Sequence, residues 1–364
     1  MSSQYFSVDY FEAREKFLTA ARAAEGKTES FLNPRAKGPG GEDLYTDVAV
    51  FGDPASPKVL VIVSGTHGNE GFCGSGCQVG FVEEGLIRNK ADDTFVVMIH
   101  ALNCYGFANV RRVTEDNADL NRNFVDHEQP YASNEAYAEI HHLLVPEDWT
   151  PETVKAANKG LAIYRSEHGD RALQNAVSGG QHSHPDGVFF GGTRPSWSNV
   201  LLRQLIERYC KDKLHVALID FHTGLGPNGY GELILNGDFE QSWERAQRWY
   251  NNEVTSFQDG SSTSAELTGM MCFAFLDVMP ADRLTGIAVE YGTVSSAEVL
   301  YAMRFDNWIS LHEKPGTPRW LEGKKTMRDA LYCDNDEWKA RVWERAQWVL
   351  SRAYDGLATV TSAE

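Results

Sequence analysis

The sequence predicts an α/β protein in which a mixed central β-sheet is flanked by helices on both faces. Short apolar segments of strand length alternate along the chain with longer segments whose apolar residues recur three and four positions apart. Valine and isoleucine dominate several of the short segments, as they do in strands buried on both faces. The 364 residues can bury a large core, and we expect a single catalytic domain over residues 1–364.

These patterns predict the positions of the main elements. Strands are expected at residues 58–64, 94–102, 216–221, 231–235 and 286–290. Helices are expected at residues 10–24, 71–87, 134–144, 151–176, 199–210, 242–254 and 336–352. Residues 178–187 and 191–197 are rich in glycine, proline and serine, which predicts loops there.

The composition excludes several classes of partner and location. The 34 lysine and arginine residues and 51 aspartate and glutamate residues give a formal charge of -17, so the protein as a whole repels nucleic acids and anionic membrane surfaces. The first residues have the pattern of an amphipathic helix and not of a secretory signal, and no apolar run reaches membrane-spanning length. The six cysteines are too scattered for a disulfide scaffold. We therefore expect a cytoplasmic protein without a nucleic-acid or membrane partner.

The strongest local motif is GTHGNEG at residues 65–71, directly after the expected strand 58–64. Ligand sites of α/β sheets form beyond the carboxyl ends of strands. His67 and Glu70, three residues apart on a glycine-flanked turn, can both point at one metal ion. This pair alone is a weak signal, because it occurs by chance in many proteins.

A third candidate ligand is His222, which follows the expected strand 216–221. Two histidines and one glutamate are a known ligand set of catalytic zinc, and they leave a fourth position for water. The alternative is that His222 only caps the strand end through a backbone hydrogen bond.

Residues 111–124 place Arg111, Arg112 and Arg122 after the expected strand 94–102. Guanidinium groups bind carboxylates through paired hydrogen bonds, and together with an amide donor such as Asn121 they suit a substrate carboxylate or a developing oxyanion. The alternative is surface ion pairing with the acidic residues of the same segment, which would contribute little.

Glu290 ends the expected strand 286–290. Burying a carboxylate at such a position is costly unless the group is paired, hydrogen-bonded or used. Beside a metal-activated water, a glutamate can take up a proton and deliver it to a leaving amine. The alternative is a carboxylate satisfied by backbone amides.

Taken together, the four segments resemble the zinc carboxypeptidase superfamily, the carboxypeptidase A-like fold that includes the succinylglutamate desuccinylase and aspartoacylase branch. The shared order is His-x-x-Glu, then arginine with DLNRNF at residues 119–124, then a strand-borne histidine, then a strand-borne glutamate. GTHGNE is most similar to the aspartoacylase side, whereas DLNRNF is common to both sides and is the most specific motif. The resemblance covers residues 58–293, which leaves the N- and C-terminal helices as decorations.

The resemblance implies a hydrolase that binds one zinc ion per chain. The implied zinc ligands are His67, Glu70 and His222. It implies that Glu290 is the general base. The family also has a tyrosine near the scissile bond, for which Tyr230 and Tyr291 are the candidates, although neither matches the family position.

The resemblance also implies roles for the arginine segment. Arg112 suits the oxyanion-stabilising arginine, and its neighbour Arg111 remains an alternative or a further substrate contact. Asn121 and Arg122 match the pair that binds the terminal carboxylate of the substrate. The expected partner is therefore a small molecule or peptide with a free carboxylate.

Two weaker signals have simpler interpretations. His182 and His184 lie in an expected loop, and we expect a substrate-facing lid there in preference to a second metal site. Cys73 and Cys77 share one helix face, where small packing residues are expected in preference to metal ligands.

The sequence therefore predicts a zinc-dependent hydrolase of an amide or peptide bond next to a free carboxylate. A metallocarboxypeptidase and an N-acyl amino acid deacylase both fit this description. A second hypothesis is a non-catalytic ligand-binding relative, against which all ligand and base positions hold chemically competent residues. The motifs of serine hydrolases, P-loop enzymes and zinc fingers are absent from the sequence.

Overall fold

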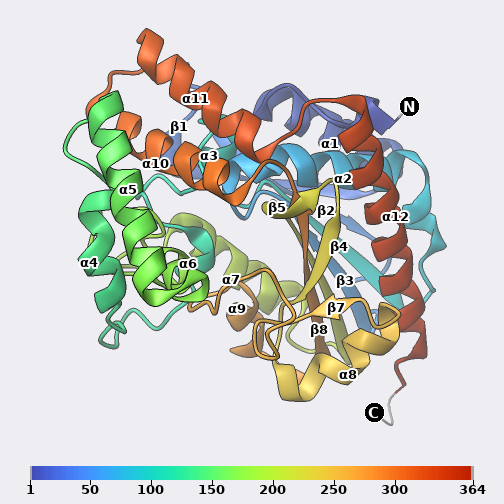
Figure 1. Ribbon diagram of the computed structural model, residues 1–364. Helices are drawn as coiled ribbons and strands as arrows, with labels where there is room; N and C mark the ends of the chain where they lie inside the picture. Colours follow the sequence, from blue (N-terminus) through green and yellow to red (C-terminus); the bar gives the residue numbers. More distant parts are fainter. Residues whose placement is uncertain (1, 362–364) are drawn as a thin grey trace.

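The computed structural model describes residues 2–361 and contains an eight-stranded mixed β-sheet (Figure 1). The strand order is β1-β2-β4-β3-β5-β8-β6-β7. The strands are β1 (Lys27–Lys37), β2 (Asp43–Phe51), β3 (Lys58–Val63), β4 (Thr94–His100), β5 (His215–Asn228), β6 (Gly231–Leu235), β7 (Val254–Thr255) and β8 (Leu284–Gly292). The four central strands β4, β3, β5 and β8 are parallel, whereas β2 and β6 run antiparallel to their central neighbours. The predicted α/β fold with a mixed sheet is confirmed.

Residues 2–361 contain twelve α-helices. They are α1 (Tyr10–Ala23), α2 (Gly71–Glu83), α3 (Cys104–Ala108), α4 (Glu135–Leu144), α5 (Pro151–His168), α6 (Asp170–Ser178), α7 (Trp197–Tyr209), α8 (Phe239–Trp249), α9 (Cys272–Leu276), α10 (Ser296–His312), α11 (Pro318–Leu331) and α12 (Asp336–Thr359). Short 3₁₀ turns occur at Ser2–Tyr5, Gly68–Glu70, Leu86–Asn89, Leu120–Arg122 and Ala281–Arg283. None of the helices in this part of the chain has the length and apolar character needed to span a membrane.

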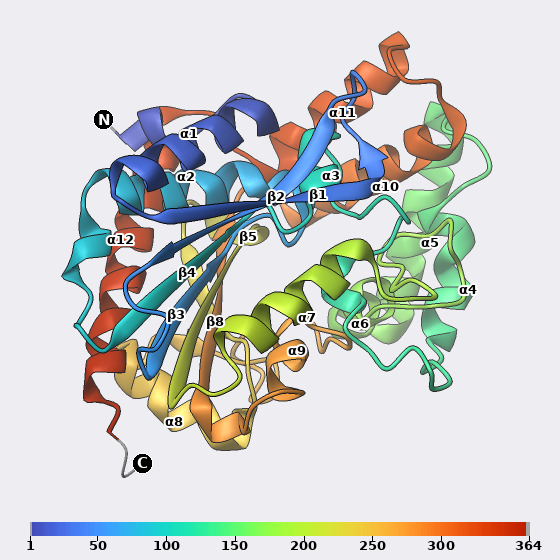
Figure 2. The same cartoon turned by 180° about the vertical axis from the view of Figure 1, so that it is seen from behind.

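Both faces of the sheet are buried under helices. In β3, Leu60 and Ile62 pack into one core, and Val59, Val61 and Val63 pack into the other. Helices α1, α2, α8 and α12 cover the first face, and α7 and α9 cover the second (Figures 1 and 2). This burial on two sides explains the continuous valine and isoleucine runs of the central strands.

Helices α4, α5, α6, α10 and α11 pack against one another beside the sheet and form a helical lobe (Figure 1). Thr150 caps α5, which has Pro151 at its first position, and a Ser295–Glu298 capping box begins α10. The lobe has its own apolar cluster, to which α4, α5, α6, α10 and α11 all contribute. It stands beyond the carboxyl ends of β5 and β8, where the motif residues lie.

The five predicted strands and seven predicted helical segments are present, with one correction. The expected helix 151–176 is two helices, because Gly169 has a φ of +91° that ends α5 and begins α6. Three strands (β1, β2 and β7) and four helices (α3, α9, α10 and α11) were not predicted.

Candidate active site

The turn after β3 carries His67 and Glu70 and is fixed to the arginine segment by backbone hydrogen bonds. Gly65 begins this turn with a φ of +67°, a conformation that favours glycine. The amide of Gly68 donates to the carbonyl of Arg112 at 3.0 Å, and the amide of Asn69 donates to the carbonyl of Arg111 at 3.0 Å. These bonds place Arg112, distant in sequence, next to His67.

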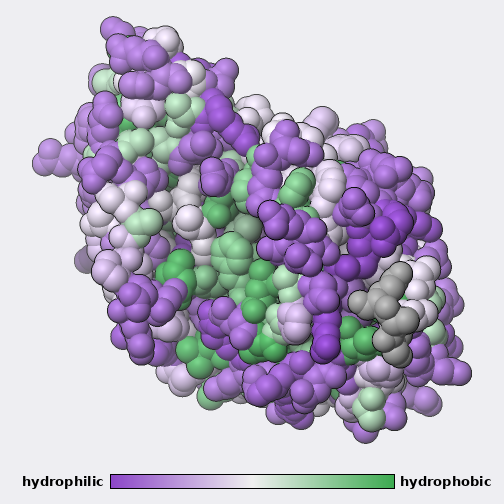
Figure 3. Space-filling model, turned by 90° about the horizontal axis from the view of Figure 1, so that it is seen from below, coloured by the Kyte–Doolittle hydropathy of each residue, from purple (hydrophilic) through white to green (hydrophobic). Residues whose placement is uncertain are grey.

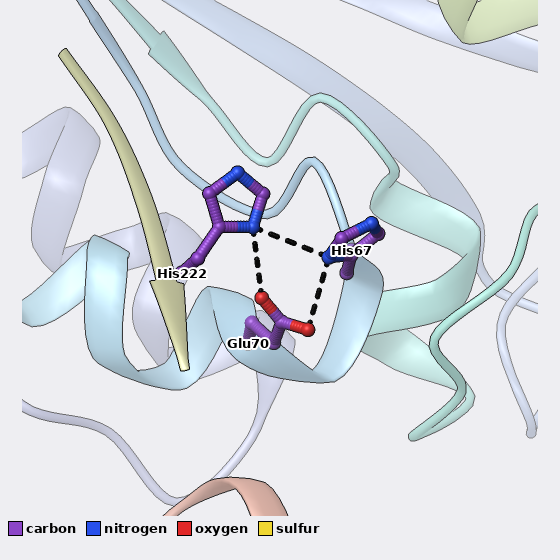
Figure 4. A group of neighbouring side chains, drawn as sticks. All are labelled: His67, Glu70 and His222. Atoms are coloured by element: carbon purple, nitrogen blue, oxygen red, sulfur yellow. Dashed lines mark hydrogen bonds and ion pairs between the residues drawn. The ribbon is translucent and has the colours of Figure 1, made fainter. Parts of the chain in front are cut away.

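The structure brings His67, Glu70 and His222 together (Figure 4). Their ligand atoms all lie within 4.8 Å of one another, and the three residues are buried. His67 Nδ1 lies 3.0 Å from Glu70 Oε1, and His222 Nδ1 lies 3.0 Å from Glu70 Oε2. The Nδ1 atom of each imidazole therefore faces the space beside the Glu70 carboxylate. Among residues 2–361 this is the single cluster of three or more possible ligands that converge in this way.

A carboxylate holds the other ring nitrogen of each histidine. His67 Nε2 lies 3.2 Å from Asp119 Oδ1, and His222 Nε2 lies 2.6 Å from Asp220 Oδ2. Asp220 is in turn held by Thr66, whose hydroxyl donates to Oδ1 at 2.8 Å. In the neutral imidazole of His222, Asp220 keeps the proton on Nε2 and leaves the Nδ1 lone pair for a metal ion. His67 Nε2 lies close to both Asp119 and Arg112 Nη2, the latter at 2.9 Å, and its Nδ1 faces Glu70. The donor set and its orientation therefore fit a zinc ion.

At Glu70 and His222, charged neighbours shift the pKa in the direction opposite to the effect of burial. Burial favours the neutral form of Glu70, but His67, His222 and Arg112 hold the pKa of this carboxyl well below its usual range. Burial likewise favours neutral His222, but Asp220 and Glu70 raise its pKa well above the ordinary value. The site thus strongly favours positive charge next to the Glu70 carboxylate.

Glu290 lies next to His222 because β8 pairs with β5 in the register His222↔Glu290. The amide of Leu225 donates to Glu290 Oε1 at 3.1 Å and fixes the carboxylate. Burial and the negative charge of Glu70 raise the pKa of Glu290 to about 8. A buried carboxylate with a raised pKa beside the three candidate ligands is well suited to proton transfer.

Arg112 also lies at this cluster. Its Nη1 donates to Glu70 Oε1 at 2.7 Å, and its Nε donates to Asp119 Oδ2 at 2.9 Å. The guanidinium carbon lies 5.2 Å from the ring centroid of Phe189, which covers it from the side of the loop. Arg112 is therefore held in place by two carboxylates and an aromatic ring.

Asn121 and Arg122 lie at the same cavity and have free donors. The Asn121 Oδ1 accepts from the amide of Met271 at 2.7 Å. The Nδ2 of the same side chain has no protein partner among residues 2–361. Arg122 donates through Nε and Nη2 to the carbonyl of Ser178 and through Nη1 to the carbonyl of Asn121. A guanidinium has five N–H groups, so about two remain for a ligand. Burial lowers the pKa of Arg122 to about 10, and the group is still charged at neutral pH.

Arg111 is not brought to this cavity. Its Nε donates to Asp306 Oδ2 at 3.2 Å and its Nη2 to Asn117 Oδ1 at 2.9 Å. Asp306 also accepts from Lys324 Nζ at 2.6 Å. Because this buried ion cluster holds the Arg111 guanidinium between α10 and α11, the structure gives no support to Arg111 as a substrate contact.

Neither candidate tyrosine lies in the cavity. Tyr230 is 51% exposed on the surface, and the buried Tyr291 donates its hydroxyl to the carbonyl of Val342 at 3.1 Å. The one tyrosine that lines the cavity within the described residues is Tyr301 of α10.

The histidine loop packs against the helical lobe. His182 Nδ1 lies 2.7 Å from the carbonyl oxygen of Gly192, and its ring stacks on Tyr131. The rings of His184 and His141 lie 4.1 Å apart and are tilted by 32°. Neither of the two loop histidines lines the cavity, whereas Ser178 at the start of this loop and Phe189 just after it do.

The cysteines after the metal motif lie inside the protein. Cys73 and Cys77 are both fully buried in α2 and pack in the core beneath the sheet. Burial raises the pKa of the Cys73 thiol well above its ordinary value, which disfavours the thiolate that binds metals. They act as packing residues, as expected.

A cavity of about 1110 Å³ opens beside these groups. Its lining comes from the carboxyl-terminal parts of β5 and β8, from the helical lobe and from residues 257–270. His67, His222, Glu290, Arg112, Asn121 and Arg122 all contribute to its lining. Six of the eight sequence-predicted site residues therefore line one cavity, Glu70 lies directly beneath it, and Arg111 lies outside.

The sequence interpretation missed Asp119, Asp220 and Phe189. Asp220 had a usable signal, because residues two apart in a strand share a face and Asp220 precedes His222 by two. Asp119 belongs to the DLNRNF motif but was interpreted as a possible surface partner, whereas it is fully buried. Phe189 has a φ of +54° in an irregular loop, for which the sequence carries no periodic signal.

Several solved protein structures are similar to this chain. Among solved structures, the chain is similar to bovine thrombin-activatable fibrinolysis inhibitor (12% identity, TM-score 0.46, 99% of this chain and 100% of that chain). It is also similar to carboxypeptidase A from Helicoverpa armigera (10% identity, TM-score 0.44, 94% of this chain and 74% of that chain). A third similar structure is succinylglutamate desuccinylase from Chromobacterium violaceum (14% identity, TM-score 0.37, 86% of this chain and 73% of that chain). The last two names belong to the superfamily that the motifs resemble. With TM-scores below 0.5, these likenesses carry no argument about activity.

No curated protein sequence matches the chain. A protein-family model matches residues 6–345, which is most of the chain, and its description is "Protein of unknown function (DUF2817)". The chain therefore belongs to the DUF2817 family.

Proposed function

We propose that the protein is a zinc-dependent hydrolase that cleaves an amide bond next to a free carboxylate. One observation carries this proposal: two imidazoles and a carboxylate converge within 4.8 Å beside a cavity that Glu290 and Arg112 also line. This arrangement combines a metal-binding set, a proton-transfer group and an oxyanion donor in one place. The motif resemblance supports the same chemistry.

His67, Glu70 and His222 would hold the ion, with Asp119 and Asp220 orienting the two imidazoles. Zinc bound there would supply Lewis acidity, polarising the scissile carbonyl and lowering the pKa of a water toward 7. Leu225 and the β5–β8 register hold Glu290 on the cavity side of these ligands.

The remaining steps belong to residues of the chain. Glu290 would take a proton from the attacking water and pass it to the nitrogen of the leaving amine. Arg112 would donate to the oxygen of the scissile carbonyl as negative charge develops there. Asn121 Nδ2 and the free N–H groups of Arg122 would bind the substrate carboxylate and so orient the amide.

Metal analysis and one substitution test the proposal. The purified protein should hold about one zinc per chain, and a chelator should abolish hydrolysis of carboxylate-bearing amides. Glu290→Gln should keep the zinc and reduce kcat by at least about 10²-fold, because the proton acceptor is lost. Glu232→Gln is the matched control, since Glu232 is a buried glutamate paired with Glu290 across β6 and β8 but absent from the cavity lining.

Two outcomes of these experiments would count against the proposal. Full activity in Glu290→Gln, or no stoichiometric metal in a folded protein, would refute the assignment. Tight binding of carboxylate amides with no product after long incubation would favour the non-catalytic alternative.

A further inference from the structure

The cavity continues from the candidate active site into a broad apolar region. Figure 3 shows apolar side chains gathered in a hollow of one face, between polar rims. At about 1110 Å³ the cavity is slightly larger than most sites that enclose drug-sized ligands. An acetyl or succinyl group on an amino acid would leave most of this volume unused.

The two sides of the active site differ in character. On one side, Asn121 and Arg122 are fixed to Met271 and Ser178, and this side presents the free donors for a carboxylate. The second side begins next to His222, at Thr223, whose backbone amide donates to Glu70 Oε2. Because the proposed function puts the scissile amide at the candidate ligands, a substrate whose carboxylate binds Arg122 would extend its acyl part toward the second side.

That second side is apolar. The hydroxyl of Thr223 donates to the carbonyl of Leu331, and Gly224 packs beside the Leu331 and Val299 side chains. The wall continues along α5 and α10, and its apolar lining comprises Leu161, Ala162, Val294, Val299, Leu300 and Met303. The apolar surface thus begins next to a candidate metal ligand and extends into the helical lobe.

Several polar groups of this wall are paired within the protein. The Asn158 Oδ1 accepts from Arg304 Nη1 at 2.7 Å, and Arg165 forms an ion pair with Asp170 at 3.0 Å. Backbone groups of α5 and α10 are bonded within their helices. A peptide extending along the apolar lining of this wall would find few partners for its amide groups, whereas a hydrocarbon chain needs none.

We propose that the acyl group of the substrate is a long aliphatic chain, so that the substrate is an N-acyl amino acid of the fatty-acyl type. This proposal rests on the proposed function and specifies its substrate. Water would add across the amide: its oxygen bonds to the acyl carbon, the C–N bond breaks, and the nitrogen takes up a proton. The products are a fatty acid and a free amino acid, and no redox partner is needed.

A chain-length series tests this substrate class. The N-acetyl, N-hexanoyl and N-decanoyl forms of one amino acid are assayed with the zinc-loaded enzyme below their critical micelle concentrations. We expect kcat/KM to rise by up to about fourfold per methylene group, the factor for full burial of one CH₂. A flat series in an active enzyme would overturn the fatty-acyl proposal and leave the hydrolase proposal intact.

Substitutions in the wall provide an independent readout. Ala162→Trp and Ala297→Trp place a large ring at exposed positions that line the cavity, and each should lower kcat/KM for the decanoyl substrate at least about tenfold while sparing the acetyl one. Ile163→Trp is the matched control, because Ile163 is 46% exposed on the same helix and does not line the cavity. Equal losses for both chain lengths would overturn the proposal.

Binding separates this inference from catalysis. Zinc-loaded Glu290→Gln protein is titrated with the acetyl and decanoyl compounds by calorimetry. If no amide is hydrolysed by the unmodified enzyme, the hydrolase proposal fails, and tighter binding of the decanoyl compound still supports an aliphatic site. Equal or absent binding of the two compounds would overturn the aliphatic site itself.

Discussion

The substitution Asp220→Asn should weaken metal binding without removing any metal ligand. Asp220 Oδ2 lies 2.6 Å from His222 Nε2, and Thr66 donates its hydroxyl to Oδ1 at 2.8 Å. We expect an asparagine in this place to keep its oxygen toward Thr66, because the Thr66 hydroxyl donates at that position. Its NH₂ group would then face His222 Nε2 and donate to it. The imidazole proton would move to Nδ1, the atom that faces Glu70 and His67.

The size of the effect follows from this tautomer change. Binding a metal through Nδ1 would require the imidazole to recover its original tautomer and to lose the bond from the new amide. Replacement of such orienting carboxylates typically costs about 10- to 100-fold in metal affinity, or about 1.4–2.7 kcal/mol. Asp220 is fully buried, so water cannot substitute for the lost acceptor, and we expect the upper part of this range.

The assay is a competition titration of zinc against a chromophoric chelator. The double variant Thr66→Val with Asp220→Asn is the informative control, since the asparagine can then turn its oxygen toward His222. It should recover part of the affinity lost in Asp220→Asn. Unchanged zinc affinity in a folded Asp220→Asn protein would refute both the proposed binding atom and the role of Asp220.

Two further predictions concern charge. Arg112→Met should lower kcat about 10²- to 10³-fold, because an oxyanion donor is lost. Arg111→Met should spare kcat and lower the free energy of unfolding by about 2 kcal/mol, because Arg111 bonds to the buried Asp306. Equal kinetic losses in the two variants would contradict this assignment. Burial lowers the pKa of His100 to about 3, so between pH 6.5 and 3 only the unfolded chain binds this proton. The free energy of unfolding should therefore fall by about 1.4 kcal/mol per pH unit below 6.5, or about 2.7 kcal/mol at pH 4.5. Urea denaturation at pH 7 and 4.5 should show a smaller difference for His100→Gln than for the unmodified protein, and equal differences would contradict the buried neutral imidazole.

The central strands could be predicted because burial on both faces produces unbroken apolar runs. The edge strand β1 could not, since its residues are mostly exposed, include Pro34, and gain their order by pairing with β2 alone. Helix α10 was missed for the opposite reason. It buries Arg304, Asp306 and Asn307 along with its apolar residues, so no single apolar stripe marks it.

The candidate ligands could be predicted from position, because His67 follows β3 and His222 lies in β5 just beyond the part that pairs with β3, so the two parallel strands bring them together. Arg111 and Arg112 could not be told apart in the sequence. Consecutive side chains point in different directions, and the choice depends on Asp306, nearly two hundred residues later. Long-range ion pairs of this kind leave no local signal.

The charges at the site connect metal binding with substrate binding. Four buried carboxyl groups (Glu70, Asp119, Asp220 and Glu290) lie around the guanidinium groups of Arg112 and Arg122. In the ionisation state that offers every ligand to a metal ion, with all four carboxyl groups ionised and both imidazoles neutral, the formal charge is -4 + 2 = -2. The whole chain carries -17, so an anionic substrate meets repulsion both at a distance and at the site. A divalent cation brings the local sum to zero, and the free donors of Arg122 can then act on a carboxylate without opposing net charge. Metal and carboxylate should therefore strengthen the binding of each other, because thermodynamic coupling between two ligands is reciprocal.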